Sequence, residues 1–437
     1  MKSRKFSLGS LVRRMFKKRP AGAITLTSKK PASTSARDRV RSGIEPLEGR
    51  IAPAILVNGH LLTYSDADGD TVTVTFSRDI FNVATVTTTV LDSVFKFSAG
   101  KAHTGAANAT DDVSQQLQLI DLGAVPTKLV HGVAQSQVAG ISFTVTSNTN
   151  PASGQALGDG FAAIGAVKAG ANALGTVMID GDLGQIDAGT GTSKVGVGIL
   201  VTQSIGKFGT TTQPALPTPD LTSEIKGRVG RIVVNEDVKG YLHVVDSTRL
   251  VGNVSTITQR GTIGQITIGG SLIGNATVAT ASDKTGRIES SFDIGTVSIA
   301  GGIIGGGGKN SGSIFAAHAL GDITVGGNVE GGRAEAAGAI GSGGTLASVK
   351  IGGDLKGGTA LLTGSVTSEG AMGAVTIGSA AVHHDLIGGA GERSGFIGAG
   401  TNLAGVHVFG KITGAGGLQS GKIVADGSVV SAIVDGI

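Results

Sequence analysis

The sequence contains no cysteine and no tryptophan, and only 3% of its 437 residues are aromatic. The absence of cysteine excludes a disulfide framework and thiolate chemistry, although it does not identify the cellular compartment. With so few aromatic side chains, a hydrophobic core must be thin and aliphatic. No run of about 18 apolar residues occurs, so the sequence predicts no membrane-spanning helix.

Glycine is abundant, at 74 residues, and 40% of the chain is hydrophobic, which argues against plain disorder. Apolar residues recur at a fixed spacing, since Leu320, Leu346 and Met372 lie 26 residues apart. Each is followed by a small residue and then by an alternating apolar-polar-apolar segment. A fixed period in this range is typical of a solenoid or a repeat array.

One irregularity supports the repeat. The interval from Met372 to Leu403 is 31 residues, five more than the standard interval. The additional residues fall between Gly378 and Asp385, because Ile377 is followed by the next apolar position after nine residues instead of four. A true repeat with one loop insertion predicts this localisation, whereas chance periodicity does not.

The residue types predict two or three short strands per repeat, joined by tight glycine corners. One repeat cannot bury its own apolar face, so stacked neighbours must cover it. We expect an inward aliphatic ladder of Ile266, Val297, Ile323, Val349, Val375 and Val406. The expected outward ladder consists of Thr267, Ser298, Thr324, Lys350, Thr376 and His407. The predicted fold is all-β, a parallel β-helix (β-solenoid) of roughly eight to nine coils.

Upstream of the repeats, residues 55–148 read as a small antiparallel β domain, and residues 149–160 as a linker to the solenoid at 161–437. Asn58-Gly59 and the segment Ser65–Asp70 are turn signals between alternating segments, which predicts hairpins. Further strands are expected over Ala84–Phe97, Leu117–Leu122 and Ile141–Thr146.

Charge divides the chain. Residues 1–50 hold 14 Lys and Arg against three Asp and Glu, and the remainder holds 22 basic and 29 acidic residues. The acidic body argues against nucleic-acid binding, because phosphate neutralisation requires clustered cations. Residues 1–54 are therefore predicted to be a basic arm. Apolar residues at helical spacing from Leu8 to Phe16 favour an amphipathic segment suited to an anionic membrane surface or an export machine, and a disordered basic tail is the alternative.

Residues 45–50, near the end of this arm, read Glu-Pro-Leu-Glu-Gly-Arg. They resemble the LEPR-XLL-type segment found near the N-terminus of exported or surface proteins of planctomycete- and verrucomicrobium-like bacteria. The leucine pair expected after the arginine is replaced by Ile51-Ala52. The resemblance implies a sorting segment followed by a repetitive extracellular body. The matching residues are Glu45, Pro46, Leu47, Glu48 and Arg50.

Asp66, Asp68 and Asp70 alternate in one turn and resemble the start of a calcium loop, because a hard cation prefers several convergent carboxylate oxygens. The helix-flanked calcium loop is excluded, since Thr71 and Ser77 occupy the positions that require glycine and glutamate. Two interpretations remain, a calcium site and a solvated hairpin turn. Apart from this cation, no cofactor is predicted.

The loop insertion carries His383, His384 and Asp385, which offer ligands for zinc or a proton shuttle. A polar surface loop is the alternative. Elsewhere, alignment of the repeats places no group of acidic residues on one face. We expect Asp322, Asp354 and Asp385 to occupy three non-equivalent positions of the repeat.

These observations favour an exported, non-enzymatic structural or adhesive protein at the cell surface or outside the cell. Its expected partners are the export machinery and an envelope or extracellular polysaccharide or protein. Exposed solenoid ends also favour head-to-tail self-association. Two alternatives are a carbohydrate-active β-helix enzyme, a lyase or hydrolase, and the passenger of a separate secretion system. The enzyme requires acidic side chains that converge in one groove.

Overall fold

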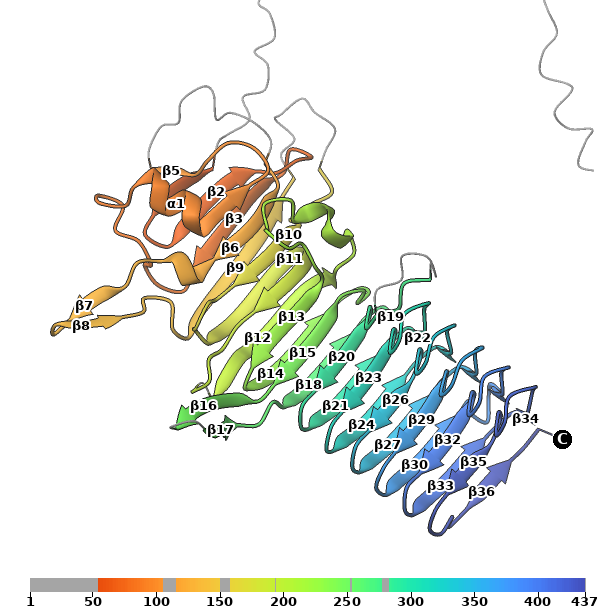
Figure 1. Ribbon diagram of the computed structural model, residues 1–437. Helices are drawn as coiled ribbons and strands as arrows, with labels where there is room; N and C mark the ends of the chain where they lie inside the picture. Colours follow the sequence, from red (N-terminus) through yellow and green to blue (C-terminus); the bar gives the residue numbers. More distant parts are fainter. Residues whose placement is uncertain are drawn as a thin grey trace, which may run out of the picture. The chain divides into compact units, whose positions relative to one another are not determined.

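The computed structural model describes residues 54–104, 115–149, 158–192, 194–251, 254–276 and 283–436. Strands account for 48% of the structure, and the described residues include one α-helix. Long parallel sheets dominate the fold, as a β-solenoid requires (Figure 1). The prediction of a sorting segment at Glu45–Arg50 concerns residues outside the described ranges, as does nearly all of the predicted basic arm.

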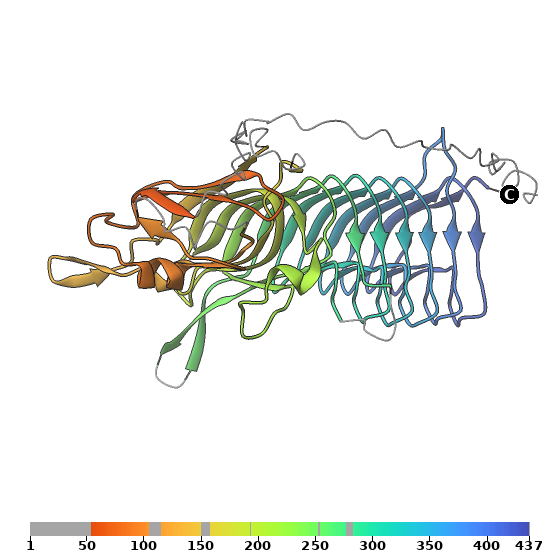
Figure 2. The ribbon, with the colours of Figure 1, turned by 90° about the horizontal axis from the view of Figure 1, so that it is seen from above.

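The longest strands of successive coils form one parallel sheet, here called the long-strand sheet, and the coils follow one another from left to right in Figure 2. Each strand pairs in parallel with the next along the chain. These strands are β11 (Leu174–Asp187), β12 (Val195–Ile205), β14 (Arg228–Val234), β18 (Ile263–Ile268), β21 (Ile294–Ile299), β24 (Leu320–Val325), β27 (Leu346–Ile351), β30 (Met372–Ile377), β33 (Leu403–Val408) and β36 (Ala432–Val434).

Two further parallel sheets close the coils. The two-residue sheet comprises β19 (Leu272–Ile273), β22 (Ile303–Ile304), β25 (Val329–Glu330), β28 (Leu355–Lys356), β31 (Leu386–Ile387) and β34 (Ile412–Thr413). The third sheet comprises β13 (Thr222–Lys226), β15 (Tyr241–Val245), β20 (Arg287–Ser290), β23 (Ser313–Ala316), β26 (Ile340–Ser342), β29 (Ser365–Ser368), β32 (Phe396–Ala399) and β35 (Ile423–Ala425). Each coil that begins with β18, β21, β24, β27, β30 or β33 thus contributes one strand to each sheet, and three strands per repeat is the higher of the two numbers predicted.

The pairing register confirms the 26-residue repeat. Leu320 pairs with Leu346, and Leu346 pairs with Met372. The insertion leaves the register intact on both sides, because Ile351 still pairs with Ile377 and Leu355 with Leu386. The additional residues therefore form a loop between strands, as predicted.

The inward ladder is also confirmed. Its six members pair in sequence from Ile266 to Val406, and each is at most 2% exposed. The neighbouring outward residues are half-buried or exposed. Because parallel strands lie about 4.8 Å apart, each aliphatic side chain packs on its equivalents above and below. Burial of this ladder lets coils without a core of their own form a stable stack.

The corner before each third-sheet strand repeats a strained backbone. A non-glycine residue adopts a positive φ, as Leu362 does at 56°, and a glycine two residues later also has a positive φ. The glycine is required, since a Cβ at Gly364 would lie 1.8 Å from the carbonyl oxygen of Lys356. The left-handed residues are Lys284, Asn310, Ala336, Leu362, Arg393 and Gln419.

A buried hydroxyl lies between these two positions in most coils. In the β32 coil, Ser394 Oγ accepts the N–H of Gly389 at 2.9 Å and donates to the carbonyl oxygen of Gly391 at 2.7 Å. Ser311 and Thr363 make equivalent pairs of bonds in their coils. Ala337 occupies this position in the β26 coil, where the N–H of Gly332 has only a 3.4 Å bond to the Ala337 carbonyl oxygen.

The strands before residue 149 extend the long-strand sheet. The predicted hairpins are confirmed, because β1 (Ile55–Asn58), β2 (Leu61–Ser65) and β3 (Thr71–Phe76) pair antiparallel in order. β9 (Ile141–Asn148) is antiparallel to β3 and parallel to β11, so it joins the hairpins to the first long coil strand. β6 (Leu117–Asp121) and β10 (Ile164–Lys168) make a second parallel connection to β11. One hydrophobic core runs from Ala54 to Val408.

The expectation of strands over Ala84–Phe97 is wrong for most of that segment. It forms α1 (Thr88–Val94), and only β4 (Phe95–Phe97) is extended. Thr87 caps the helix by accepting the N–H of Val90 at 3.3 Å, and Leu91 and Val94, three residues apart, are buried together. Capping and burial of one helical face outweigh the β propensity of the Thr and Val residues.

Other elements branch from the coils or precede them. These are β5 (His103–Thr104), the 3₁₀ turns η4 (Leu122–Ala124) and η6 (Gly209–Thr212), and the hairpins β7 (Lys128–Val130) with β8 (Val133–Gln135) and β16 (Ser247–Val251) with β17 (Val254–Gln259).

We predict opposite effects of two reciprocal substitutions at the hydroxyl corner. Ser394→Ala removes the acceptor for the partly buried N–H of Gly389 and should lower the unfolding free energy by about 1–2 kcal/mol. Ala337→Ser supplies an acceptor to Gly332 and should raise it by about 1 kcal/mol. Urea denaturation followed by circular dichroism measures both changes. Destabilisation by both variants would contradict this account of the corner.

Candidate functional site

A cleft of about 460 Å³ lies where the hairpin region meets the first coils. Here the regular repeat is lost, since β11 and β12 have 14 and 11 residues and η6 follows β12. Carboxylates line the cleft from three separate segments of the chain. We call it the acidic cleft, and the lining residues important here are Asp66, Asp68, Asp159, Phe161, Asp182 and Phe208.

The predicted aspartate cluster lies in the turn between β2 and β3, and the structure brings its carboxylates together. One oxygen of each of Asp66, Asp68 and Asp70 lies within 4.8 Å of the others. Asp70 is fully buried, Asp66 is 8% exposed and Asp68 is exposed. The N–H groups of Gly69 and Asp70 donate to Asp66 Oδ1 at 3.1 and 2.8 Å, which shapes the turn.

The same carboxylates bind the segment that enters the first coil. Asp68 Oδ2 accepts the N–H of Asp159 at 3.0 Å, and Asp70 Oδ2 accepts the N–H of Gly160 at 2.6 Å. Ser147 Oγ donates to Asp70 Oδ2 at 3.3 Å. The carboxylates of this turn therefore connect β3, β9 and the start of the solenoid, by accepting one hydroxyl and two backbone N–H groups.

The two cleft-facing carboxyls of this turn differ in pKa. Burial and the hydrogen-bonded Asp68 carboxyl raise the pKa of Asp66 to about 8. The hydrogen bond from Asp66 lowers the pKa of Asp68. Of the two hydrogen-bonded carboxyls, Asp66 is thus the more readily protonated. Two carboxyls with divergent pKa values are suited to acid-base chemistry or to binding a cation.

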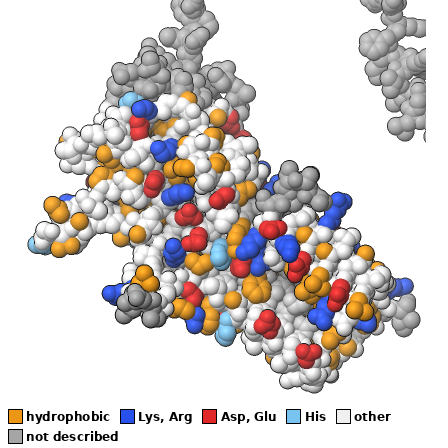
Figure 3. Space-filling model, viewed as in Figure 1, with side chains coloured by type: hydrophobic (Ala, Val, Ile, Leu, Met, Phe, Trp, Pro, Cys, Tyr) orange, Lys and Arg blue, Asp and Glu red, His pale blue; other side chains and the backbone are white. Residues whose placement is uncertain are grey.

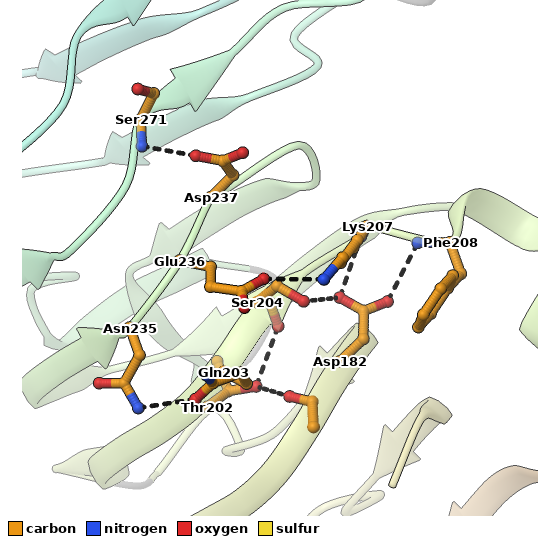
Figure 4. A network of polar contacts seen from close by, with 11 residues as sticks. Asp182, Thr202, Gln203, Ser204, Lys207, Phe208, Asn235, Glu236, Asp237 and Ser271 are labelled. Carbon is orange, nitrogen blue, oxygen red and sulfur yellow. Dashed lines mark hydrogen bonds and ion pairs between the residues drawn. The ribbon is translucent and has the colours of Figure 1, made fainter. Parts of the chain in front are cut away.

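A polar network holds another part of the cleft lining (Figure 4). Asp182 Oδ1 accepts Ser204 Oγ at 2.7 Å and the N–H of Lys207 at 2.9 Å, while its Oδ2 accepts the N–H of Phe208 at 3.3 Å. Lys207 Nζ pairs with Glu236 Oε2 at 2.9 Å. Asp182 thus fixes the backbone that carries Phe208, and the Lys207 side chain is paired with Glu236.

Two phenylalanines provide apolar surface beside these carboxylates. Phe161 is 39% exposed and Phe208 is 46% exposed, and both line the cleft. Exposed aromatic faces next to polar groups are suited to stacking on a ligand ring.

Comparison with protein-family models, curated proteins and solved structures found no match. The chemistry of the site is therefore inferred from its own geometry. Within the described residues, the structure has no helix long and apolar enough to cross a membrane.

A second polar group lies on the outer face of the third sheet, where charged side chains of both signs gather over β13, β15 and β20 in Figure 3. We call it the polar strip. The pairing register places Glu224, His243 and Glu289 in one row and Tyr241 beside Arg287 in the next. The strip consists of Glu224, Tyr241, His243, Lys284, Arg287 and Glu289.

Glu289 is the centre of the polar strip. Its Oε2 accepts Tyr241 OH at 2.5 Å and Arg287 Nε at 2.8 Å, and Lys284 Nζ lies 3.4 Å away. Burial raises its pKa, but the bond and charge of Arg287 outweigh burial and lower the pKa to about 2. The Tyr241 pKa is raised by burial and by this bond. Tyr241 and Arg287 thus donate hydrogen bonds to Glu289, and Lys284 forms an ion pair with it. Because Tyr241 lies on β15 and Glu289 on β20, the cluster stabilises the stacking of these two strands.

The histidines of the loop insertion are separated. His384 Nδ1 lies 2.9 Å from Asp354 Oδ1, whereas His383 is exposed. Asp354 Oδ1 accepts the N–H of Asp385, and Asp385 Oδ1 accepts the N–H of Lys411 at 2.7 Å. His384 and Asp385 therefore participate in a ladder that links consecutive coils.

This ladder corrects one expectation. Asp354 and Asp385 occupy equivalent positions, because each precedes one member of the Leu355–Leu386 pair. Asn328 holds the same position one coil earlier and accepts the N–H of Asp354. The insertion displaces Asp385 in sequence without displacing it in space. Asp322 pairs with Ser348 and is not equivalent to them.

Sequence reasoning did not identify Asp159, Asp182 or the polar strip as site residues. The repeat pattern is clearest in the long strands, whereas these residues belong to the irregular first coils and to the third sheet. Tyr241 and Glu289 are 48 positions apart and belong to repeats of unequal length. An alignment of the third strands alone would have brought His243 next to Glu289.

We predict that Glu289 contributes stability that acid removes. Its folded pKa of about 2 lies below the ordinary value of 4.5, so the contribution is complete above pH 4.5 and is lost as pH falls towards 2. Denaturant midpoints measured across this window should fall less steeply for Glu289→Gln than for the wild type. Exposed Glu335→Gln is the control and should follow the wild type. An unchanged slope in Glu289→Gln would contradict the assignment.

Proposed function

We propose that the protein is an exported, non-enzymatic structural or adhesive component of the cell surface or extracellular space. The proposal includes a solenoid of roughly eight to nine coils preceded by a small antiparallel β domain. The observation that carries it is the unbroken in-register stack, in which six inward positions from Ile266 to Val406 are aliphatic and buried. Such a stack makes a stiff scaffold whose outward positions are free to vary.

The distribution of charge along the chain supports export. Its first 50 residues carry a strong positive charge, while the remainder is acidic. The arm would engage the export machinery, and the folded body would contact an envelope or extracellular polysaccharide or protein. The acidic body disfavours nucleic acid as a partner. Export as the passenger of a separate secretion system is compatible with the same features.

Cell-surface labelling tests this proposal. A membrane-impermeant amine reagent applied to intact cells should label the lysines of the solenoid, such as exposed Lys350. A cytosolic protein is the negative control. Sequencing the N-terminus of the labelled protein then locates any processing within the arm. An unlabelled protein retained in the cytosol would refute the export proposal.

Head-to-tail association is a second part of the proposal. Strand β36 has apolar side chains at the end of the described stack, with Ile433 48% and Val434 40% exposed. Light scattering after size exclusion should show oligomers whose proportion grows with concentration. Ile433→Lys should reduce them, because a charge opposes strand addition at an edge. A monomer at all concentrations would contradict this part.

A carbohydrate-active enzyme is the second candidate function, and the acidic cleft is the observation that favours it. Acids do converge there, with Asp66 and Asp68 close together and Asp159 and Asp182 in the same lining. Asp66 would donate a proton to the leaving oxygen, and a second acid of the lining would act as base, because Asp68 is hydrogen-bonded to Asp66 and does not lie across a scissile bond from it. The exposed rings of Phe161 and Phe208 would stack on sugar rings.

The enzyme candidate is tested by incubation of the full chain with neutral and uronic-acid polysaccharides. Reducing ends report hydrolysis, and ultraviolet absorbance of unsaturated uronides reports elimination. If the cleft is catalytic, Asp66→Asn should reduce turnover at least about 100-fold, the usual contribution of a general acid. Exposed Asp180→Asn is the matched control on β11 and should retain activity. No product from any substrate would leave the non-enzymatic proposal favoured.

A further inference from the structure

The aspartate turn concentrates negative charge that no cation among the described residues neutralises. Asp66, Asp68 and Asp70 each direct one oxygen into a space where all three lie within 4.8 Å. Among the described residues, no Lys, Arg or His nitrogen forms an ion pair with any of them. Lys207, the cation lining the same cleft, is paired with Glu236 instead. Like charges this close repel strongly unless a proton or a cation joins them.

Burial makes this arrangement still more costly. Asp70 is 0% exposed, and its Oδ1 has no hydrogen-bond partner among the described residues. An ionised carboxylate removed from water is destabilising unless it is paired or binds a metal. A buried oxygen without a partner is therefore an independent indication of a ligand, in addition to the clustering of the three acids.

We propose that Asp66, Asp68 and Asp70 bind one calcium ion at the inner end of the acidic cleft. All the side-chain donors are oxygen atoms, which suit a hard cation and disfavour zinc or copper. Calcium accepts six to eight oxygens in flexible geometry, whereas magnesium demands a regular octahedron and retains its waters. The cleft, lined by Asp66 and Asp68, supplies the route of entry.

The ion would strengthen the junction between the hairpin region and the solenoid. Asp68 and Asp70 already accept the N–H groups of Asp159 and Gly160, which lead into β10. A cation that neutralises these carboxylates allows them to remain ionised and keep both bonds. Calcium should therefore raise the thermal midpoint of the full chain, because a ligand that binds only the folded state stabilises it.

Terbium luminescence tests the site directly. Tb³⁺ is a luminescent substitute for Ca²⁺ and is sensitised by a nearby aromatic ring. The chain has two tyrosines and no tryptophan, and Tyr64 is two residues from Asp66. Excitation of tyrosine in the EDTA-treated full chain should produce saturable Tb³⁺ emission that Ca²⁺ displaces. Tyr64→Phe should abolish the emission while leaving calcium binding intact, and Tyr241→Phe should preserve the emission.

Isothermal titration of the same protein with CaCl₂ should show one site per chain, with a dissociation constant between about 1 µM and 1 mM. Asp68→Asn should weaken binding at least tenfold, and because Asp68 is exposed this variant should fold normally. Asp180→Asn is the control and should bind as the wild type. The proposal is overturned by the absence of saturable binding, by tighter binding of Mg²⁺, or by equal affinities of the two variants.

Discussion

The parallel register between consecutive coils is the constraint on which the rest of the structure depends. Each backbone N–H of a long strand must donate to a carbonyl oxygen of a strand one coil away, and the resulting register places Val349 between Ile323 and Val375. The inward side chains must then pack on side chains of similar size. The same register stacks the hydroxyls and asparagine or aspartate side chains of the corners. Insertions are tolerated only where they leave the strands, as the loop before Asp385 does.

The polar and charged side chains that converge on one another lie where the coils depart from the regular repeat. The outward positions of the regular long strands carry mainly Thr, Ser, Lys and His, whereas the first coils have unequal lengths, long strands and the η6 turn. There the chain can bring Asp66, Asp159 and Asp182 to one cleft from three separate segments. Glu289 and its donors lie at a similar irregularity, beside coils whose lengths differ. A scaffold in which the coils are nearly identical offers few other places for different side chains to meet.

Local features of the sequence predicted much of the fold. The period from Leu320 to Met372, the inward ladder and the Asn58-Gly59 hairpin depend on residues close in the chain or repeated along it, and all are confirmed. The helix at Thr88–Val94 was missed because its stability depends on burying Leu91 and Val94 against distant strands. Of the site, the Asp66–Asp70 turn was recognised from spacing alone, since its members are neighbours.

By itself, the sequence determined the period, the strand and corner positions and the clustering of three carboxylates in one turn, because these are short-range properties repeated or adjacent along the chain. Only the tertiary structure decided which surfaces those carboxylates face. It placed Asp182 and Phe208 in the same cleft lining as Asp68, and it made Asp354 and Asp385 equivalent despite the insertion. The physical reason is that stacking fixes distances between coils, and these distances do not depend on the number of residues in the intervening loops.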